Sequence, residues 1–404
     1  MRYPTYIKNC IELLERSGYH AYAVGGAVRD ALLSKEPSDW DVTTSARPDE
    51  ILSVFSGFRT IPTGIKHGTV TVLVPNDDKC DERVPVEITT FRIDGKYGDA
   101  RHPESVRFSP NVEDDLSRRD FTVNAMAFNE KEGLIDLFGG RNDLEDRIIR
   151  AVGDPEKRFS EDALRILRAF RFSSQLEFEI EENTLLGAKK CATLLKKISR
   201  ERVGSEFKKL ILSSGVVYSL EKMAELGIWG EIFDIPYPEK DMICRLRELN
   251  NGHFETRLAV LVADLDNEQR DEFLNSLRLS NADKKLIIRL CSVKDFEICE
   301  SEKERKARSF LHYFGDILPL SLEILRFYNA DSEDFARLVE LEASQKRPLS
   351  ISELDIRGSD ILPLCAGDYS RVGKTLAILL ECVLDDPSLN RKEKLIEIAK
   401  KELE

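Results

Sequence analysis

The sequence of 404 residues contains no apolar run approaching the roughly 18 residues of a membrane-spanning helix. The opening segment, residues 1–20, also lacks the apolar centre and cleavage pattern of a secretory signal. We therefore expect a cytoplasmic protein that does not associate with membranes. Histidine is scarce, and the eight cysteines are scattered singly. Their spacing excludes a zinc site built from close cysteine pairs and a disulfide-stabilised fold.

Positive charge is also in deficit, because the formal net charge is −13 at pH 7. Phosphate binding depends on local positive charge, so this balance excludes a protein that coats nucleic acid non-specifically, but it allows a basic groove. Residues 187–213 have the opposite balance, with eight lysines and arginines against two glutamates. This segment is a candidate RNA-binding surface, and the alternative is a solvated helix face.

The length and the composition, 42% hydrophobic and 33% charged, predict a globular chain of several packed units. Runs typical of strands, such as GTVTVLV, are confined to the first 150 residues, and from about Pro155 the spacing becomes helical. We expect an α+β protein with a mixed sheet in its first domain and only helices thereafter. Breaks rich in proline divide the helical part near residues 234–238 and 347–348.

Two glycines, Gly25 and Gly26, follow a predicted strand and open a predicted helix. Bare backbone amides at a helix N-terminus can bind a phosphate group, and Arg29 in the first turn would face the same anion. Two glycines before a helix are common, so this pattern alone does not identify a site.

Two aspartates, Asp39 and Asp41, stand two positions apart in an expected strand. On a strand this spacing puts both carboxylates on one face, roughly 7 Å apart along the backbone. Hard oxygen ligands favour Mg²⁺ over zinc, and a pair of Mg²⁺ ions can assist transfer of a nucleotide. The alternative is a surface pair or a cap. Glu87, in the expected strand VPVEITTF, is an open candidate for a third carboxylate.

The segments GGAVRD and DWDVTTSARPDE together resemble the signature of the polymerase-β-like nucleotidyltransferases, specifically the class II CCA-adding enzyme and poly(A) polymerase family. The resemblance runs from Tyr19 to Leu212 and includes, in the family's order, FRIDGKYGDARHP, RRDFTVNAMAF, GLIDLFGGRNDLEDRIIRAVGDP and SEDALRILRAFRF. It implies a nucleotidyltransferase head over residues 1–150, followed by helical domains. These are a neck (151–233) with a nucleotide-selecting helix, a body (234–345) and a tail (346–404).

The same resemblance implies a template-independent tRNA nucleotidyltransferase that uses Mg²⁺ and adds CCA, from CTP and ATP, to the 3′ end of tRNA. It further implies that Arg119 contacts the nucleotide and that Asp120, with Asn124 nearby, helps to select NTP over dNTP. Arginine can pair bidentately with phosphate, and carboxylate and amide groups can bind ribose hydroxyls. The alternative is a salt bridge between Arg119 and Asp120 on a surface turn.

Residues 161–171 are predicted to form one helix, with Asp162 and Arg165 on the same face. In the family the matching positions form a protein template: the carboxylate accepts from the exocyclic amine shared by cytosine and adenine, and the guanidinium donates to ring acceptors. Arg168 and Arg171 lie further round the helix, where they suit the triphosphate or tRNA. The alternative is an amphipathic helix with solvated charges.

Several other functions stay open. The segment 91–103 matches a flexible loop of family members that complete the terminal A, which argues against a CC-only enzyme, although a surface hairpin is the alternative. An A-adding enzyme or a poly(A) polymerase would share these motifs. The segment that ends at Asp264 lacks the histidine of a phosphohydrolase site. A non-catalytic RNA-binding protein would not need Asp39 or Asp41. The sequence indicates no protein partner.

Overall fold

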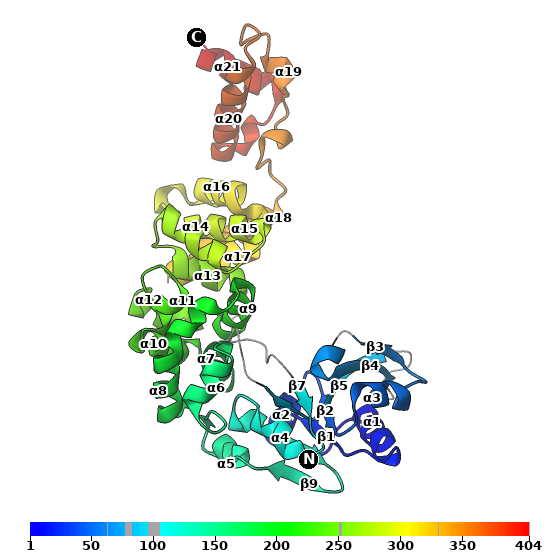
Figure 1. Cartoon of the computed structure of the whole chain (residues 1–404). Coiled ribbons are helices and arrows are strands. Elements are labelled where there is room, and N and C mark those ends of the chain that lie inside the picture. The colour runs from blue at the N-terminus through cyan, green and yellow to red at the C-terminus, as the bar shows by residue number, and fades with distance from the viewer. Residues whose placement is uncertain (63, 77–82, 96–105, 250–252, 330, 404) are drawn as a thin grey trace. The chain divides into compact units, whose positions relative to one another are not determined.

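The computed structural model describes the chain except for residues 63, 77–82, 96–105, 250–252, 330 and 404. It forms two compact units, and Figure 1 labels their helices and strands. The first comprises Met1–Cys244 with Asn267–Leu279, and the second comprises Arg245–Asp266 with Ser280–Glu404. The first unit contains every residue of the predicted site. The finer division at residues 150, 233 and 345 stays a prediction.

The first unit is built on a seven-stranded sheet with the order β3-β4-β5-β2-β1-β8-β9. Strands β2 and β5 are parallel and the other neighbours are antiparallel, so the predicted mixed sheet is confirmed. The strands are β1 (Ala21–Val24), β2 (Asp41–Thr44), β3 (Arg59–Ile61), β4 (Thr69–Pro75), β5 (Arg83–Thr90), β8 (Met126–Asn129) and β9 (Gly133–Asp136).

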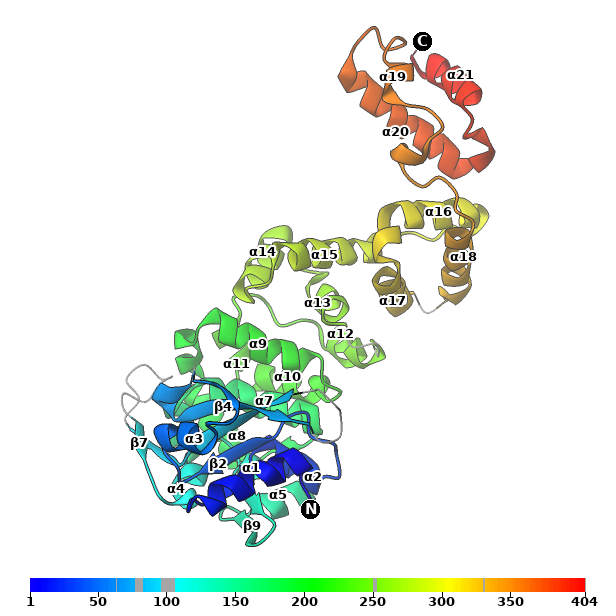
Figure 2. The ribbon, with the colours of Figure 1, turned by 90° about the vertical axis from the view of Figure 1, so that its right-hand side faces the viewer.

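Helices cover this sheet, and all four residues of the interior strand β1 are buried. Helix α1 (Thr5–Arg16) lies against the sheet and contacts β1 (Figure 2). It buries Ile7, Ile11 and Leu14, which helical spacing puts on one side. Tyr22 and Val24 instead pack with residues of α4 (Val112–Ser117). The other elements here are α2 (Gly26–Leu32), α3 (Pro48–Val54), α5 (Gly140–Glu145), η1 (Ile65–His67), η2 (Thr122–Asn124), and a small sheet of β6 (Arg92–Asp94) and β7 (Val106–Phe108).

The first unit continues as helices, with one short exception: β10 (Ile148–Ile149) pairs with β11 (Glu179–Ile180). The helices are α6 (Pro155–Glu161), α7 (Leu164–Leu176), α8 (Glu182–Cys191), η3 (Ala192–Lys197), α9 (Arg200–Ile211), α10 (Val216–Glu225), α11 (Ile228–Ile232), α12 (Lys240–Arg245) and α14 (Asn267–Ser276). Four rings join α9, α11 and α14. Phe233 lies 4.7 Å from Trp229, 4.8 Å from Phe273 and 5.0 Å from Phe207, between ring centroids. This aromatic cluster assigns α14 to the first unit.

The prediction of one continuous helix over residues 161–171 was wrong. Helix α6 ends at Glu161, and Asp162 is extended, with φ −141° and ψ 102°. The Asp162 carboxylate accepts a hydrogen bond from the backbone N–H of Leu164 at 3.1 Å, at the start of α7. An aspartate that binds the backbone two residues on favours a helix start over a helix interior, which explains the break. Asp162 and Arg165 therefore do not share one helix.

The second unit is helical in the part that the structure describes. Its elements are η4 (Leu246–Glu248), α13 (Phe254–Val262), α15 (Asn281–Cys291), η5 (Ser292–Asp295), η6 (Glu300–Glu302), α16 (Lys303–Phe314), η7 (Gly315–Ile317), α17 (Leu318–Tyr328), α18 (Glu333–Ser344), η8 (Ile351–Glu353), α19 (Gly358–Ile361), α20 (Tyr369–Asp385), η9 (Pro387–Leu389) and α21 (Lys392–Leu403). No helix among the described residues is long and apolar enough to span a bilayer.

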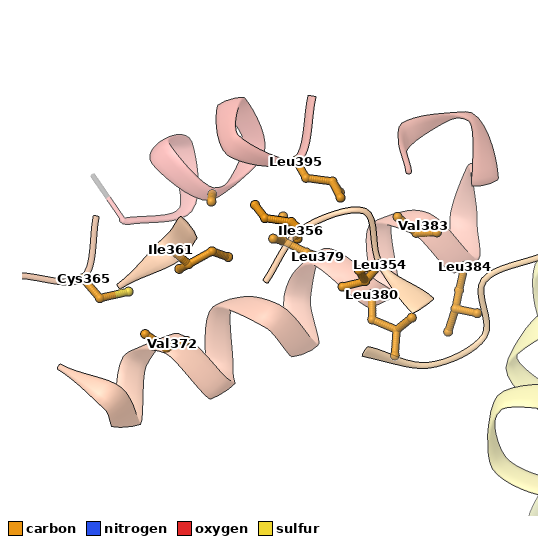
Figure 3. Packing of buried hydrophobic residues seen from close by; sticks show 11 residues of the cluster. Leu354, Ile356, Ile361, Cys365, Val372, Leu379, Leu380, Val383, Leu384 and Leu395 are labelled. Carbon is orange, nitrogen blue, oxygen red and sulfur yellow. The ribbon is translucent and has the colours of Figure 1, made fainter. Parts of the chain in front are cut away.

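The last helices of this unit enclose their own apolar core (Figure 3). Leu379, on α20, is fully buried in it with Ile361 of α19 and Leu395 of α21. Buried Arg308 of α16 donates hydrogen bonds to the carbonyl oxygens of Leu384 and Asp385. These carbonyls end α20, where a helix leaves acceptors unsatisfied, so Arg308 stabilises the end of that helix.

We expect Leu379→Ala to lower the free energy of unfolding by roughly 2–5 kcal/mol, because it leaves a cavity in a closed core. Ile378→Ala, at the adjacent and exposed position, is the matched control and should cost about 0.5 kcal/mol or less. Denaturant unfolding of both variants measures the difference. Equal losses for the two substitutions would contradict the packing described for α20.

Candidate functional site

Three strands meet where the candidate site begins. Val24, the last residue of β1, lies opposite Asp41 of β2 and Ala127 of β8. The chain leaves β1 at Gly25, whose N–H donates to the carbonyl of Met126 at 3.2 Å. This register brings the two glycines, the aspartates and the segment before β8 to one edge of the sheet.

Ten of the twelve predicted site residues line a single cavity of about 630 Å³ at this edge. They are Gly25, Gly26, Arg29, Asp39, Asp41, Arg119, Asp120, Asn124, Arg168 and Arg171. Both aspartates are exposed to it. Strand β2 begins at Asp41, so Asp39 precedes the strand. The prediction that both aspartates lie on one strand was therefore wrong.

Asp41 lies in a negative environment. Displacement of water by surrounding protein atoms, together with the charges of Glu87 and Asp39, raises the pKa of its carboxyl to about 6, although Arg119 opposes this shift. Glu87 is close because Val42 and Ile88 are register partners, so the preceding residues of the parallel strands β2 and β5 point to the same side. A cation bound at this position would relieve the repulsion.

Gly25 allows an arginine to approach the aspartates. Its φ is +78°, a value that side chains other than glycine rarely adopt, and a Cβ there would lie 3.1 Å from Nη1 of Arg119. Arg119 in turn donates to the fully buried carboxylate of Asp115 at 3.1 Å. Burial alone would raise the pKa of Asp115, but the charges and hydrogen bonds of Arg118 and Arg119 outweigh it and lower that pKa.

A second set of polar contacts joins the segment after Arg119 to α7. Arg168 Nε donates to Oδ2 of Asp120 at 2.8 Å, and Asn124 Nδ2 donates to Oδ1 at 3.3 Å. Asn124 also accepts from Arg29 Nη1 at 2.7 Å. Burial would raise the pKa of Asp120, yet Arg168, with help from Arg165 and Asn124, lowers it to about 2. Asp120 is therefore an ionised acceptor at neutral pH.

Arg171 completes the positive wall of the cavity. Its Nε lies 3.1 Å from Oε2 of Glu206 on α9, and both side chains are buried. Burial and the charge of Arg168 lower the pKa of Arg171 to about 10, while Glu206 opposes this shift. The guanidinium is still protonated at neutral pH and can bind an anion.

The predicted base-reading pair does not line the cavity among the described residues. Asp162 Oδ2 accepts from Arg202 Nη2 at 2.8 Å. Arg165 Nη1 donates to Glu161 at 2.8 Å and Nη2 donates to the carbonyl of Arg118 at 2.9 Å. Both side chains are therefore held by protein groups beside the cavity.

Sequence reasoning missed other residues of the cavity wall: Asp30, Lys35, Glu36, Ser38, Phe172 and Gln175. Sequence reasoning also missed Asp115, which does not line the cavity but pairs with Arg119. Its spacing of four residues from Arg119 could have predicted this ion pair. Lys209 belongs to the basic segment 187–213 and also lines the cavity. Of the predicted loop 91–103, the part from residue 96 lies outside the described residues.

Two parts of the chain match known families. Residues 21–150 match the "Poly A polymerase head domain", and residues 177–242 match the "Probable RNA and SrmB-binding site of polymerase A". The mixed sheet and its aspartate-lined cavity thus belong to a nucleotidyltransferase of the poly(A) polymerase type.

Full-length relatives give the family more closely. The CCA-adding enzyme of Streptococcus gordonii is 38% identical over 338 residues, which cover 83% of this chain and 81% of that protein. The CCA-adding enzyme of Ligilactobacillus salivarius is 34% identical over 413 residues, which cover 99% and 98%. The chain belongs to the CCA-adding enzyme family, as its motifs predicted.

Solved structures agree with this assignment. The crystal structure of the Bacillus stearothermophilus CCA-adding enzyme in complex with CTP is 29% identical and has a TM-score of 0.83, covering 100% of this chain and 98% of that one. The Thermotoga maritima CCA-adding enzyme complexed with tRNA shares the fold, with 23% identity, a TM-score of 0.68 and coverage of 100% and 97%.

We expect Asp41→Asn to stabilise the metal-free protein at neutral and alkaline pH. The pKa of Asp41 is raised in the folded state, so folding favours its protonated form, and the wild type loses stability as the pH rises from about 4 to about 6. The asparagine cannot ionise. Melting temperatures in the presence of a chelator should therefore differ at about pH 8 and converge near pH 4. A difference in melting temperature that stays constant across this range would contradict the raised pKa of Asp41.

Proposed function

We propose that this protein is a template-independent tRNA nucleotidyltransferase that adds C, C and A, from CTP and ATP, to the 3′ end of tRNA and releases pyrophosphate. One observation carries the proposal: in a chain of the CCA-adding enzyme family, one cavity brings Asp39 and Asp41 against a wall of arginines. With tRNA as its substrate, the protein acts in the cytoplasm.

The aspartate pair fits a divalent metal. Both carboxylates are open to the cavity, and negative charge surrounds Asp41. No group of three or more His, Cys, Asp or Glu side chains able to hold a metal occurs in the described part of the chain, so binding would rest on the pair Asp39 and Asp41. Carboxylate oxygens suit Mg²⁺, which when bound would activate the attacking hydroxyl and neutralise charge on the leaving pyrophosphate.

The chain's own residues position the nucleotide. Arg119, Arg168 and Arg171 supply positive charge for the triphosphate, and the backbone at Gly25 and Gly26 lies beside them. Asp120, ionised at neutral pH, can accept from ribose hydroxyls. The 3′-hydroxyl oxygen of tRNA then forms a bond to the α-phosphorus, and the bond from that phosphorus to the pyrophosphate oxygen breaks. Positioning and charge do most of this work.

We assign base selection to Asp162 and Arg165, which lie beside the cavity and would have to meet the base from there. A carboxylate has several lone-pair directions, so Asp162 can accept from the exocyclic amine of cytosine or adenine while Arg202 holds it. Guanine and uracil present carbonyl oxygens at that place and would be repelled. Arg165 offers donors to the ring acceptors of the base.

The test of the activity is extension of tRNA transcripts that end before C74, after C74 and after C75, with Mg²⁺ and CTP, ATP or both. We expect the first transcript to grow by C, C and A and then stop. Extension of only the last transcript by one A would identify an A-adding enzyme, and long A tails would identify a poly(A) polymerase. A protein that binds RNA without extending it would overturn the proposal.

Asp39→Ala and Asp41→Ala should each lower the extension rate by roughly 100-fold or more, because each removes a carboxylate ligand from the metal. Glu145→Ala, at an exposed acidic position of α5, is the control and should leave the rate unchanged. Comparable rates for all three variants would separate the activity from the aspartate pair.

We expect Asp162→Ala and Arg165→Ala to lose discrimination against GTP and UTP while the affinity for Mg²⁺ stays unchanged. The measurement is kcat/KM for each of the four nucleotides on the transcript that ends after C75. Unchanged discrimination would show that other groups read the base.

A further inference from the structure

The ring of Phe172 on α7 has three arginines around it. The guanidinium carbons of Arg171, Arg168 and Arg29 lie 4.0, 5.1 and 5.2 Å from its centroid. All four residues line the cavity, and Phe172 is almost fully buried. A cation within about 6 Å of an aromatic face is attracted by the negative charge of that face. Each arginine is therefore stabilised by the same ring.

These arginines repel one another. The charges of Arg168 and Arg29 both lower the pKa of Arg171, in addition to its burial. Carboxylates offset part of the repulsion: Asp30 pairs with Arg29, Asp120 with Arg168 and Glu206 with Arg171. Each of these anions also repels any phosphate that enters the cavity. A phenyl ring attracts the guanidiniums without carrying a net charge, so it leaves the wall attractive to anions.

The position of the ring is itself determined by packing. Phe172 contacts Phe121 edge to face, with 5.8 Å between ring centroids and an interplanar angle of 77°. Phe121 is fully buried and directly follows Asp120. On α7, Arg168, Arg171 and Phe172 are spaced so that they share one face, while Arg29 comes from α2. The ring thus connects arginines of two separate elements.

We propose that Phe172 is a positioning residue for the triphosphate of the incoming nucleotide. Its ring holds Arg29, Arg168 and Arg171 together against their mutual repulsion, in the arrangement that binds the phosphates. This inference rests on the proposed function for the identity of the ligand. Phe172 acts on nucleotide binding indirectly, by holding the three arginines in place.

The direct test replaces Phe172 with phenylalanines that carry one, two or three fluorine atoms, introduced by stop-codon suppression. Each fluorine weakens the negative face of the ring while its shape stays nearly the same. We expect the Kd for CTP and the KM for CTP and ATP to rise stepwise, by roughly tenfold over the series, with kcat changed much less. A flat series would overturn the proposal, because a purely structural ring would not respond to its charge distribution.

Phe172→Leu and Phe170→Leu form a matched pair for the same question. Phe170 is fully buried on the same helix, and in the described part of the structure no arginine lies over its ring. Both substitutions should lower the melting temperature, but only Phe172→Leu should raise the Kd for CTP. An equal Kd for both variants would overturn the inference. Because CTP binding is measured without tRNA, this outcome stays distinct from a wild-type protein that binds CTP and fails to extend tRNA.

Discussion

The ion pair between the buried carboxylate of Asp120 and the partly exposed guanidinium of Arg168 is the contact on which the cavity depends. It joins the segment before β8 to α7, and Asn124 extends it to Arg29 on α2. Loss of Arg168 would leave the buried charge of Asp120 without its main partner, which is costly, so this network determines how α7 lies against the end of the sheet. Since α7 carries Arg168 and Arg171 and β2 begins at Asp41, the pair also determines which charges face each other across the cavity.

The positive and the negative side of the cavity differ in how their charge is offset. Carboxylates and the ring of Phe172 offset the charges of the arginines, whereas at Asp41 the charges of Glu87 and Asp39 outweigh that of Arg119. Groups of the protein offset the positive wall, and under the proposed function a divalent metal at Asp39 and Asp41 would offset the negative side. Active sites often retain such unfavourable groups because the ligand, and not the fold, neutralises them.

The sequence alone was sufficient for the sheet-bearing domain, the helical remainder and ten residues of the cavity wall. Gly25, Asp39 and Asp41 stand close together in short motifs whose spacing carries their chemistry, and the family resemblance supplied Arg119, Asp120 and Asn124. It was not sufficient for Asp162, because the run 161–171 has helical spacing throughout and the break depends on a side-chain hydrogen bond to Leu164. Phe172 was not predicted either. In the sequence a phenylalanine on an amphipathic helix is typical of a core residue, and its contact with Arg29 of α2 depends on the tertiary fold.

The aromatic cluster of the first unit has a consequence for synthesis of the chain. Phe273 packs against Trp229 and Phe233, although the chain passes through the second unit between them, over Arg245–Asp266. The first unit therefore cannot complete its core when its 244 leading residues emerge from the ribosome. Its core is complete only after α14 has been synthesised, and until then the apolar faces of α9 and α11 stay uncovered. A ribosomal pause before α14 would therefore prolong the exposure of an aggregation-prone apolar surface.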